Sequence, residues 1–317
     1  MEVKPTFKDK AIQFTLNLPI IKHLIMISKE VSLPGFSKIP IYYVLIFFYK
    51  GLFKGDISQR SAALSFTFFL ALFPAIISLF TFIPYIPIDN FQNTLLSTIT
   101  DIVPKATWDV LGPLITDIIS RQRGSLLSIS FLSAIFFASN GVMGISKAFN
   151  NSYHAIDTRK PMKQRLISLW LVTILALLVV FAVGLVIGGK ISIDYLISHQ
   201  LLKGSFGINM LILGKWLIVM ALMFISISFI YFIAPANKKY YKFLSPGSSL
   251  ATIMSLLLII GFDTYVSNFT RYNALYGSIG TLIALMIFLY FNGMVLLIGF
   301  ELNVSIYQAK LNYWKEG

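Results

Sequence analysis

The sequence predicts an all-α polytopic membrane protein with six transmembrane helices, an N-terminal interfacial helix and two short outer amphipathic helices. Of its 317 residues, 56% are hydrophobic and 12% are charged, and the mean hydropathy is +0.78. Soluble domains carry roughly 25% charged residues, so this composition indicates that lipid is the solvent. Apolar runs recur along the chain, and about 20 such residues cross a bilayer at 1.5 Å rise per residue.

These runs define a membrane domain over residues 56–308. The first span contains Pro74 near its middle, and we expect a kink there because proline removes a helix hydrogen bond. The last span follows a glycine-punctuated turn and ends at the carboxylate of Glu301 and the amide of Asn303. The six expected spans are about 57–83, 125–147, 166–189, 208–233, 246–268 and 277–307.

Three further segments flank or interrupt the spans. Residues 1–55 are expected to form a cytoplasmic arm that ends in an interfacial helix, because the apolar run 41–53 has only 13 residues and is too short to span. Leucine, isoleucine and valine at helical spacing predict two short outer helices, about 89–101 and 104–120. Residues 309–317 are expected to be a cytoplasmic tail.

The basic residues are unequally distributed between the two sides of the predicted membrane domain. Of the 26 lysines and arginines, 19 fall in the segments on the side of the termini and 7 on the other side. By the positive-inside rule, both termini are predicted to be cytoplasmic. The same distribution explains the formal net charge of +13 without a nucleic-acid partner. The segments richer in basic residues are 1–60, 147–165, 234–246 and 301–317.

Polar side chains in or at the ends of spans are candidates for a polar path or gate. Glu301 and Arg60 lie near the inner ends of the sixth and first spans, where a structural ion pair is favoured over a gate or a proton-coupling carboxylate. Asp263 is expected to pair locally with Arg271 rather than to line a pathway. The mid-span amides Asn140 and Asn292 most often bond a neighbouring helix, and the alternative is that they line a polar cavity beside the Pro74 kink.

Two basic inner loops are candidates for binding the phosphorylated headgroup of a membrane lipid. The simpler interpretation is that they set the topology and contact anionic headgroups in general. Membrane lipids, anionic ones among them, are therefore the expected partners. The basic residues concerned are Lys147, Arg159, Lys160, Lys163, Arg165, Lys238, Lys239 and Lys242.

The sequence contains no recognisable catalytic or metal-binding pattern. It has no cysteine, and its histidines (His23, His154 and His199) fall in the arm, an inner loop and an outer loop. Neither an HExxH nor a GxSxG pattern is present. We therefore expect no cofactor, no metal and no enzymatic activity.

Five segments together resemble the YihY/BrkB family of bacterial inner-membrane proteins, once labelled ribonuclease BN. Phe300 stands where the family commonly has a small residue, and residues 286–288 lack its usual tryptophan. The resemblance implies a six-helix inner-membrane protein with links to envelope integrity, virulence and lipid transport. The ribonuclease label is disfavoured, because a metal-dependent nuclease needs ligands that the pattern does not supply. The segments are SAALSFTFFLALFPAI, KAFNNSYHAIDTRK, APANKKYYKFLSPGSSLAT, YNALYGSIGTLIAL and LLIGFELN.

Two function classes follow from these observations. The first is a transporter or flippase of a lipid or other amphiphile in envelope maintenance. The second is a non-transporting scaffold whose outer helices (89–121) and arm bind other envelope proteins. A polar path that joins Asn140, Asn292 and Glu301 favours the first class, and a tightly packed apolar interior favours the second.

Overall fold

α-Helices make up nearly all of the described chain, which confirms the all-α class. The computed structural model describes residues 19–85, 92–93, 96, 105–152, 155–156, 159–198, 205–237, 242–267 and 278–316. Within these residues the one sheet is a short antiparallel pairing of β1 (Asn151–Ser152) with β2 (Ala155–Ile156). This pairing forms a small hairpin directly after the second long helix.

In the part of the chain that the structure describes, six helices are long and apolar enough to cross a membrane, which confirms the predicted set of spans. Their positions follow the apolar runs of the sequence. The first of them continues through Pro74 without a break. The six are α4 (Ile57–Phe82), α7 (Gly124–Asn150), α8 (Pro161–Ser198), α9 (Ser205–Ile233), α10 (Pro246–Ser267) and α12 (Ser278–Glu316).

Two of these helices are longer than the sequence suggested. α8 has 38 residues and α12 has 39, so α12 runs through the segment expected to be a tail. No glycine or proline follows Gly299 until Gly317, so nothing in the sequence stops the helix. Its last turns are also held by packing, since Ile306 and Ala309 form a buried cluster with Phe36, Ile39 and Val44.

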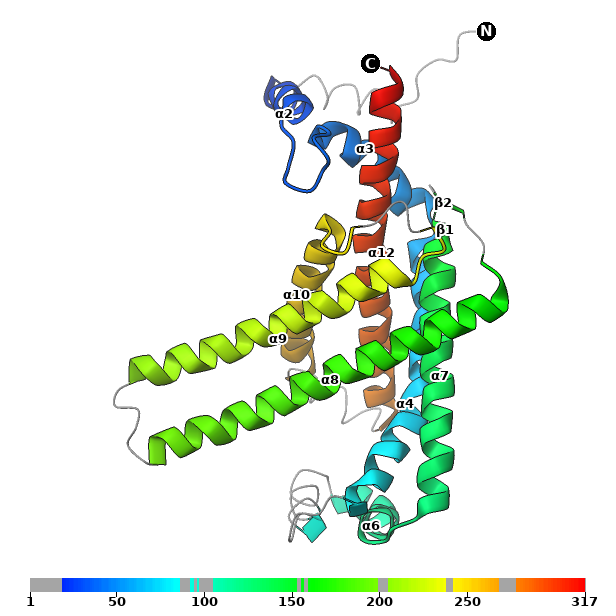
Figure 1. The fold of residues 1–317 in the computed structure, drawn as a ribbon, viewed down its shortest axis with the longest axis vertical. Helices are drawn as coiled ribbons and strands as arrows, with labels where there is room; N and C mark the ends of the chain where they lie inside the picture. The colour runs from blue at the N-terminus through cyan, green and yellow to red at the C-terminus, as the bar shows by residue number, and fades with distance from the viewer. Residues whose placement is uncertain are drawn as a thin grey trace.

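Three spans form the central bundle. α4 lies between α7 and α12 and packs against both, and α10 packs on α12 (Figure 1). Their facing sides bury a common core that includes Leu64, Val142, Ile145 and Leu297. The interior is therefore apolar along much of its length, and its polar contacts are gathered at one end.

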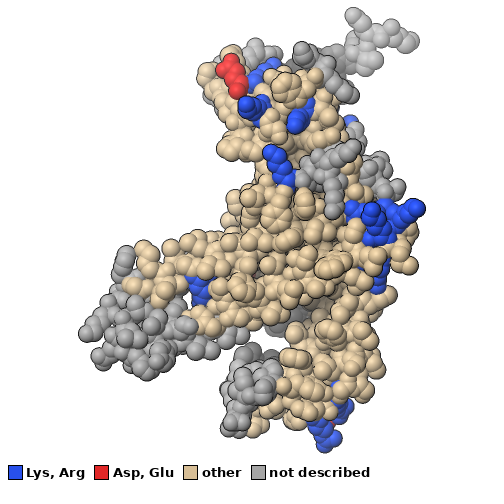
Figure 2. All heavy atoms as spheres, viewed as in Figure 1, with Lys and Arg blue, Asp and Glu red and all other residues tan. Residues whose placement is uncertain are grey.

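α8 and α9 form a long hairpin that projects sideways from the central bundle (Figure 1). Large apolar side chains on it are exposed, among them Leu177, Val180, Phe181 and Trp216. The described part of the hairpin is almost free of charge in the space-filling view (Figure 2). These surfaces have the composition of helices that face lipid.

The two ends of the molecule carry different short helices. α2 (Pro19–Glu30) and α3 (Ile41–Lys54) lie near the C-terminus, where α3 packs against α12, and α6 (Lys105–Ser120) lies at the opposite end (Figure 1). α3 and α6 match the predicted helices at 41–53 and 104–120. The other predicted outer helix, 89–101, falls almost wholly outside the described residues.

Candidate functional site

A buried ion pair joins the first and last spans. Nη2 of Arg60 on α4 donates to Oε1 of Glu301 on α12 at 2.9 Å, and Nη1 donates to the carbonyl of Ala148 at 2.7 Å. The hydroxyl of Ser152 on β1 donates to Oε2 of Glu301, also at 2.9 Å. Glu301 is 0% exposed, and each of its carboxylate oxygens accepts a hydrogen bond from a protein donor in place of water.

The end of α7 is also tied to the end of α9. Ser146 donates to the carbonyl of Ala234, and the backbone N–H of Ala236 donates to Oδ1 of Asn150 at 2.9 Å. Arg159 donates to the carbonyl of Ala236 at 3.3 Å. Burial lowers the pKa of the Arg159 guanidinium from its usual value. The segment just after α9 is thus hydrogen-bonded both to the α7 end and to the loop before α8.

α10 and α12 cross at a contact between two glycines. A Cβ placed on Gly299 would lie 2.6 Å from the carbonyl oxygen of Gly247, so the crossing accepts no side chain. One turn further on, Oδ1 of Asn303 accepts from the N–H of Gly247 at 2.8 Å, and Nδ2 donates to the hydroxyl of Ser245 at 2.9 Å. The start of α10 is therefore fixed to the last span by direct backbone contact.

Three aromatic side chains pack together in the core, and one of them, Phe300, directly precedes Glu301 in the chain. Phe300 stacks on Phe149 with ring centroids 3.9 Å apart and an interplanar angle of 5°. Tyr231 meets both rings edge-on, and its hydroxyl donates to the carbonyl of Leu296 at 2.7 Å. The Phe300 that departs from the resembled family thus fills the core between α7, α9 and α12.

A cavity of about 410 Å³ lies between α4 and α7, next to the ion pair. Arg60 lines it, with a side chain that is 11% exposed. Lys147 adds a cation to the lining and Asn140 adds an amide. The Asn140 amide oxygen accepts a hydrogen bond from Arg165. The guanidinium of Arg165 lies 4.5 Å from the centroid of the Phe136 ring. Apolar side chains complete the wall, so the cavity has both polar and apolar surface. Its other lining residues are Ala63, Leu64, Thr67, Met143, Gly144, Ala148 and Asn151.

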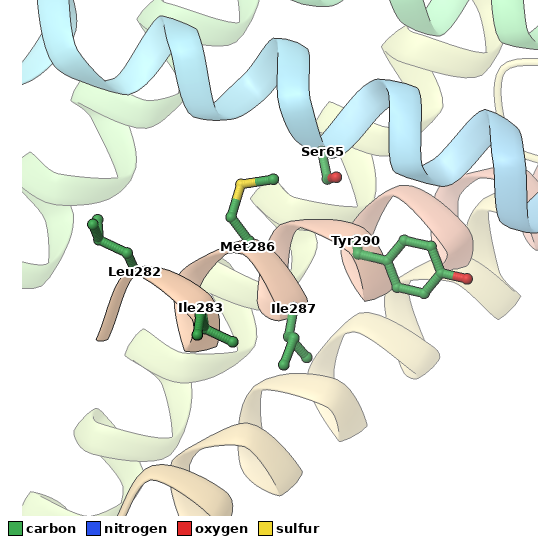
Figure 3. A pocket seen from close by; sticks show the side chains of 6 residues that line it. All are labelled: Ser65, Leu282, Ile283, Met286, Ile287 and Tyr290. Carbon is green, nitrogen blue, oxygen red and sulfur yellow. The ribbon is translucent and has the colours of Figure 1, made fainter. Parts of the chain in front are cut away.

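A second groove on the other side of α4 is apolar. It has a volume of about 380 Å³ and lies between α4 and α12 (Figure 3). Ser65 faces it from α4, and Leu282, Met286 and Tyr290 line it from α12. Unlike the α4–α7 cavity, it has no charged side chain among its described lining residues.

The structure brings some of the predicted path residues together and leaves others apart. Arg60 and Glu301 form the expected pair, and Asn140 shares the α4–α7 cavity with Arg60. Asn292 donates to the carbonyl of Phe288 in its own helix at 2.9 Å. Asp263 is exposed on α10, and the Arg271 expected beside it lies outside the described residues.

The predicted basic residues occupy different surroundings. Lys147 and Arg165 lie at the α4–α7 cavity, whereas Lys160 and Lys163 are exposed at the start of α8. Lys242 lines a different pocket near the C-terminal part of α12. Lys238 and Lys239 lie outside the described residues. Figure 2 shows basic side chains at the end of the molecule near α2 and α3 and beside the start of α8.

Several residues of this site were not singled out from the sequence, and four of them show why. Ser152, Gly247, Gly299 and Ser245 all take part in the contacts described above. Their signal was present, because each lies in one of the quoted segments that carry the family resemblance. What the sequence does not state is that these segments meet at one end of the bundle.

No group of three or more His, Cys, Asp or Glu side chains that could hold a metal ion occurs among the described residues. Of the three histidines, only His23 is described; His154 and His199 are not. The arrangement at the ion pair can hold helices together and present cations to a neighbouring cavity. Its chemistry is that of binding and positioning.

Comparison with known proteins identifies the family. The model of the family described as virulence factor BrkB matches residues 48–316. A ribonuclease-like protein, YfkH, of Bacillus subtilis is 30% identical over 252 residues, which cover 80% of this chain and 90% of the relative. A UPF0761 membrane protein of Haemophilus influenzae is 25% identical over 82% of this chain and 94% of its own length. No solved structure is significantly similar. The chain belongs to the BrkB virulence factor family and is a membrane protein.

Proposed function

We propose that the protein binds a membrane lipid or similar amphiphile in the α4–α7 cavity and acts as its transporter or flippase. The observation that carries the proposal is the mixed lining of this cavity. Lys147 supplies positive charge for an anionic headgroup beside the Glu301-paired guanidinium of Arg60, while Leu64 and Met143 supply apolar wall for the chains. A volume of about 410 Å³ is sufficient for a headgroup. The proposal assigns no catalytic step to the chain.

The distribution of charge gives the proposal an orientation. Arg60 and Lys147 belong to segments that carry most of the lysine and arginine, which is expected of the cytoplasmic side. In this orientation the protein lies in the bacterial inner membrane with both termini in the cytoplasm. The cavity then meets the inner leaflet, whose anionic lipids are attracted to basic side chains.

The polar groups do not continue through the bundle in the described residues. Asn292 bonds its own helix and does not line the cavity with Arg60 and Asn140. A headgroup bound beside Arg60 therefore needs a rearrangement of α4 against α7 or α12 to travel further. Pro74 lies in α4 beyond the cavity, at a position where a helix bends more readily.

The close packing beside Glu301 favours a second candidate, a non-transporting scaffold of the envelope. Glu301 and Phe300 are almost completely buried, and the carboxylate is fully hydrogen-bonded. A site built in this way also serves a protein that only holds its spans in place. In this case the outer helix α6 and the arm bind other envelope proteins.

Native mass spectrometry of the gently extracted protein separates specific lipid binding from bulk lipid. We expect a selectively enriched lipid that is lost in Lys147→Gln and kept in Lys163→Gln. Both changes remove one exposed lysine near the same end of the bundle, and only Lys147 lines the cavity. Lipid in bulk proportions, or equal loss in the two variants, contradicts binding at this cavity.

Movement of lipid is tested in liposomes that carry a fluorescent analogue of the enriched lipid in both leaflets. An impermeant reductant quenches the analogue in the outer leaflet. A flippase that moves the analogue from the inner to the outer leaflet exposes the remaining fluorescence to the reductant. We expect quenching beyond the outer-leaflet share with the wild type and with Lys163→Gln, and reduced quenching with Lys147→Gln. Specific binding without movement rejects the transporter in favour of the scaffold.

A further inference from the structure

A second polar pocket lies away from the α4–α7 cavity, near the C-terminal part of α12. It has a volume of about 180 Å³ and is enclosed by three separate segments. Ser37 comes from the turn between α2 and α3, Lys242 and Ser245 from the segment before α10, and Asn303 and Lys310 from α12. The pocket is smaller than the roughly 300–1,000 Å³ of sites for drug-sized ligands.

The walls of this pocket are held in place by hydrogen bonds and close contacts. Asn303 and Ser245 are buried and bonded to each other at 2.9 Å. On the opposite wall Gly35 has a φ of +87°, and a Cβ there would lie 2.6 Å from Cγ of Pro246. Only glycine fits at position 35, because this position combines a left-handed backbone conformation with close contact to the start of α10.

The pocket is positively charged. Lys242 and Lys310 approach it from different segments, and no aspartate or glutamate lines it among the described residues. Neither lysine forms an ion pair with a carboxylate in the described part of the chain. Two like charges that share a small pocket repel each other, and a bound anion removes this repulsion.

The turn that forms one wall is held in a costly conformation. Ser37 and Lys38 have φ values of 55° and 64°, in the left-handed region that residues other than glycine rarely adopt. Such residues persist where the surrounding structure holds them, and they cluster at ligand clamps. Ser37 therefore lines the pocket from a rigid turn and not from a free loop.

We propose that this pocket binds a phosphate group through Lys242, Lys310 and Ser37. Lysines supply the charge and the hydroxyl supplies a directed hydrogen bond, which is a common composition for phosphate recognition. The phosphate belongs either to the headgroup of a membrane lipid or to a free phosphorylated solute. The inference is independent of the transport proposal, because it concerns a different pocket and requires no movement of lipid.

A bound phosphate connects the N-terminal helices to the membrane domain. Ser37 belongs to the unit of α2 and α3, whereas Lys242 and Lys310 belong to the bundle. One ligand that bonds all three joins these parts by charge-assisted contacts, in addition to the apolar contact of Ile39 and Val44 with Ile306. The ligand thus stabilises the folded protein by binding to it and not to the unfolded chain.

The first experiment is a thermal unfolding series of the purified full chain in detergent, with inorganic phosphate titrated against chloride at constant ionic strength. If the source is a free anion, phosphate raises the unfolding temperature of the wild type and has much less effect on Lys242→Gln/Lys310→Gln. The control is Lys160→Gln/Lys163→Gln, which removes the same charge from the exposed start of α8, outside both pockets, and keeps the phosphate effect. Lys242 and Lys310 are both exposed, and the Lys310→Gln variant alone is compared with the wild type if the double variant does not fold.

The second arm tests a lipid source in nanodiscs of phosphatidylcholine with or without phosphatidic acid, a lipid with a phosphate monoester headgroup. If the lipid is the source, phosphatidic acid raises the unfolding temperature of the wild type and of the control but not of Lys242→Gln/Lys310→Gln. Soluble phosphate then has no effect. If neither probe distinguishes that variant from the control, the proposed phosphate site is wrong.

Discussion

Arg60 and Glu301 are 241 positions apart in the chain and 2.9 Å apart in the structure. The same guanidinium also holds the carbonyl of Ala148, so one side chain connects α4, α7 and α12. The carboxylate has a second donor in Ser152 and no contact with solvent. This geometry is that of a structural connection between the first, second and last spans.

Removal of one partner from this pair is expected to be strongly destabilising. Glu301→Gln leaves Arg60 without its counter-charge, and a broken buried pair costs about 3–5 kcal/mol. The double variant Arg60→Met/Glu301→Leu is expected to lose less than the sum of its single changes, because neither charge is then left alone. Denaturant unfolding of the four proteins in micelles gives the coupling free energy.

The same variants separate a structural carboxylate from a coupling one. If Glu301→Gln is as stable as the wild type and yet moves no lipid in liposomes, the carboxylate has a role in transport and not in assembly. If it is destabilised and the folded fraction remains active, the pair is structural.

Gly299→Ala is expected to disturb the crossing of α10 and α12. The added Cβ would lie 2.6 Å from the carbonyl oxygen of Gly247, and neither backbone can move aside without shifting its helix. Overpacking of this kind costs about 1–3 kcal/mol. The matched control is Gly184→Ala in α8, where nothing lies within 4 Å of the new Cβ. Thermal unfolding that is equally affected by the two changes contradicts the close crossing.

Gly144→Leu tests the α4–α7 cavity by filling it. Gly144 lines the cavity, and a Cβ there meets Leu64 Cδ2 at 3.3 Å, so the longer side chain extends into the space next to Arg60. We expect the folded, monodisperse fraction of this variant to retain much less specific lipid in native mass spectrometry. Gly214→Leu on α9, with open space around its Cβ, is the control and keeps the lipid.

Cysteine labelling tests the orientation in the membrane without background, because the chain has no cysteine. Arg121, Lys163 and Lys310 are all exposed and accept single replacements. In intact spheroplasts an impermeant maleimide is expected to label Arg121→Cys only. Lys163→Cys and Lys310→Cys are expected to react after lysis. The reverse pattern places the termini outside and removes the orientation on which the transport proposal depends.

The spans and the ion pair could be predicted from the sequence for simple physical reasons. Twenty apolar residues have no better solvent than lipid, and a charge at the membrane boundary requires a partner, so Arg60 and Glu301 were natural candidates. The end of α12 could not be predicted in this way, because hydropathy falls after Gln308 while the helix continues through its packing on α3. Hydropathy reports the solvent and does not report tertiary contacts.

The contacts between segments were beyond prediction from one sequence. Nothing in a single chain states that Gly247 meets Gly299 or that Ser152 meets Glu301, since no periodicity links positions in different helices. The partner of the Asn292 amide group was beyond prediction for a related reason. A carbonyl in the preceding turn of its own helix was available and satisfied the amide, so a neighbouring helix was not needed.

The separation of Arg60 and Glu301 along the chain also determines when the ion pair can form during synthesis. At about 5–20 residues per second, the ribosome adds Glu301 roughly 12 to 50 s after Arg60. During this interval the first spans are already in the membrane, and the long side chain of Arg60 can only reach towards the headgroups. The end of the bundle that holds this ion pair is therefore completed last. A nascent chain that stalls before Glu301 leaves five spans inserted without the contact that joins the first of them to α12.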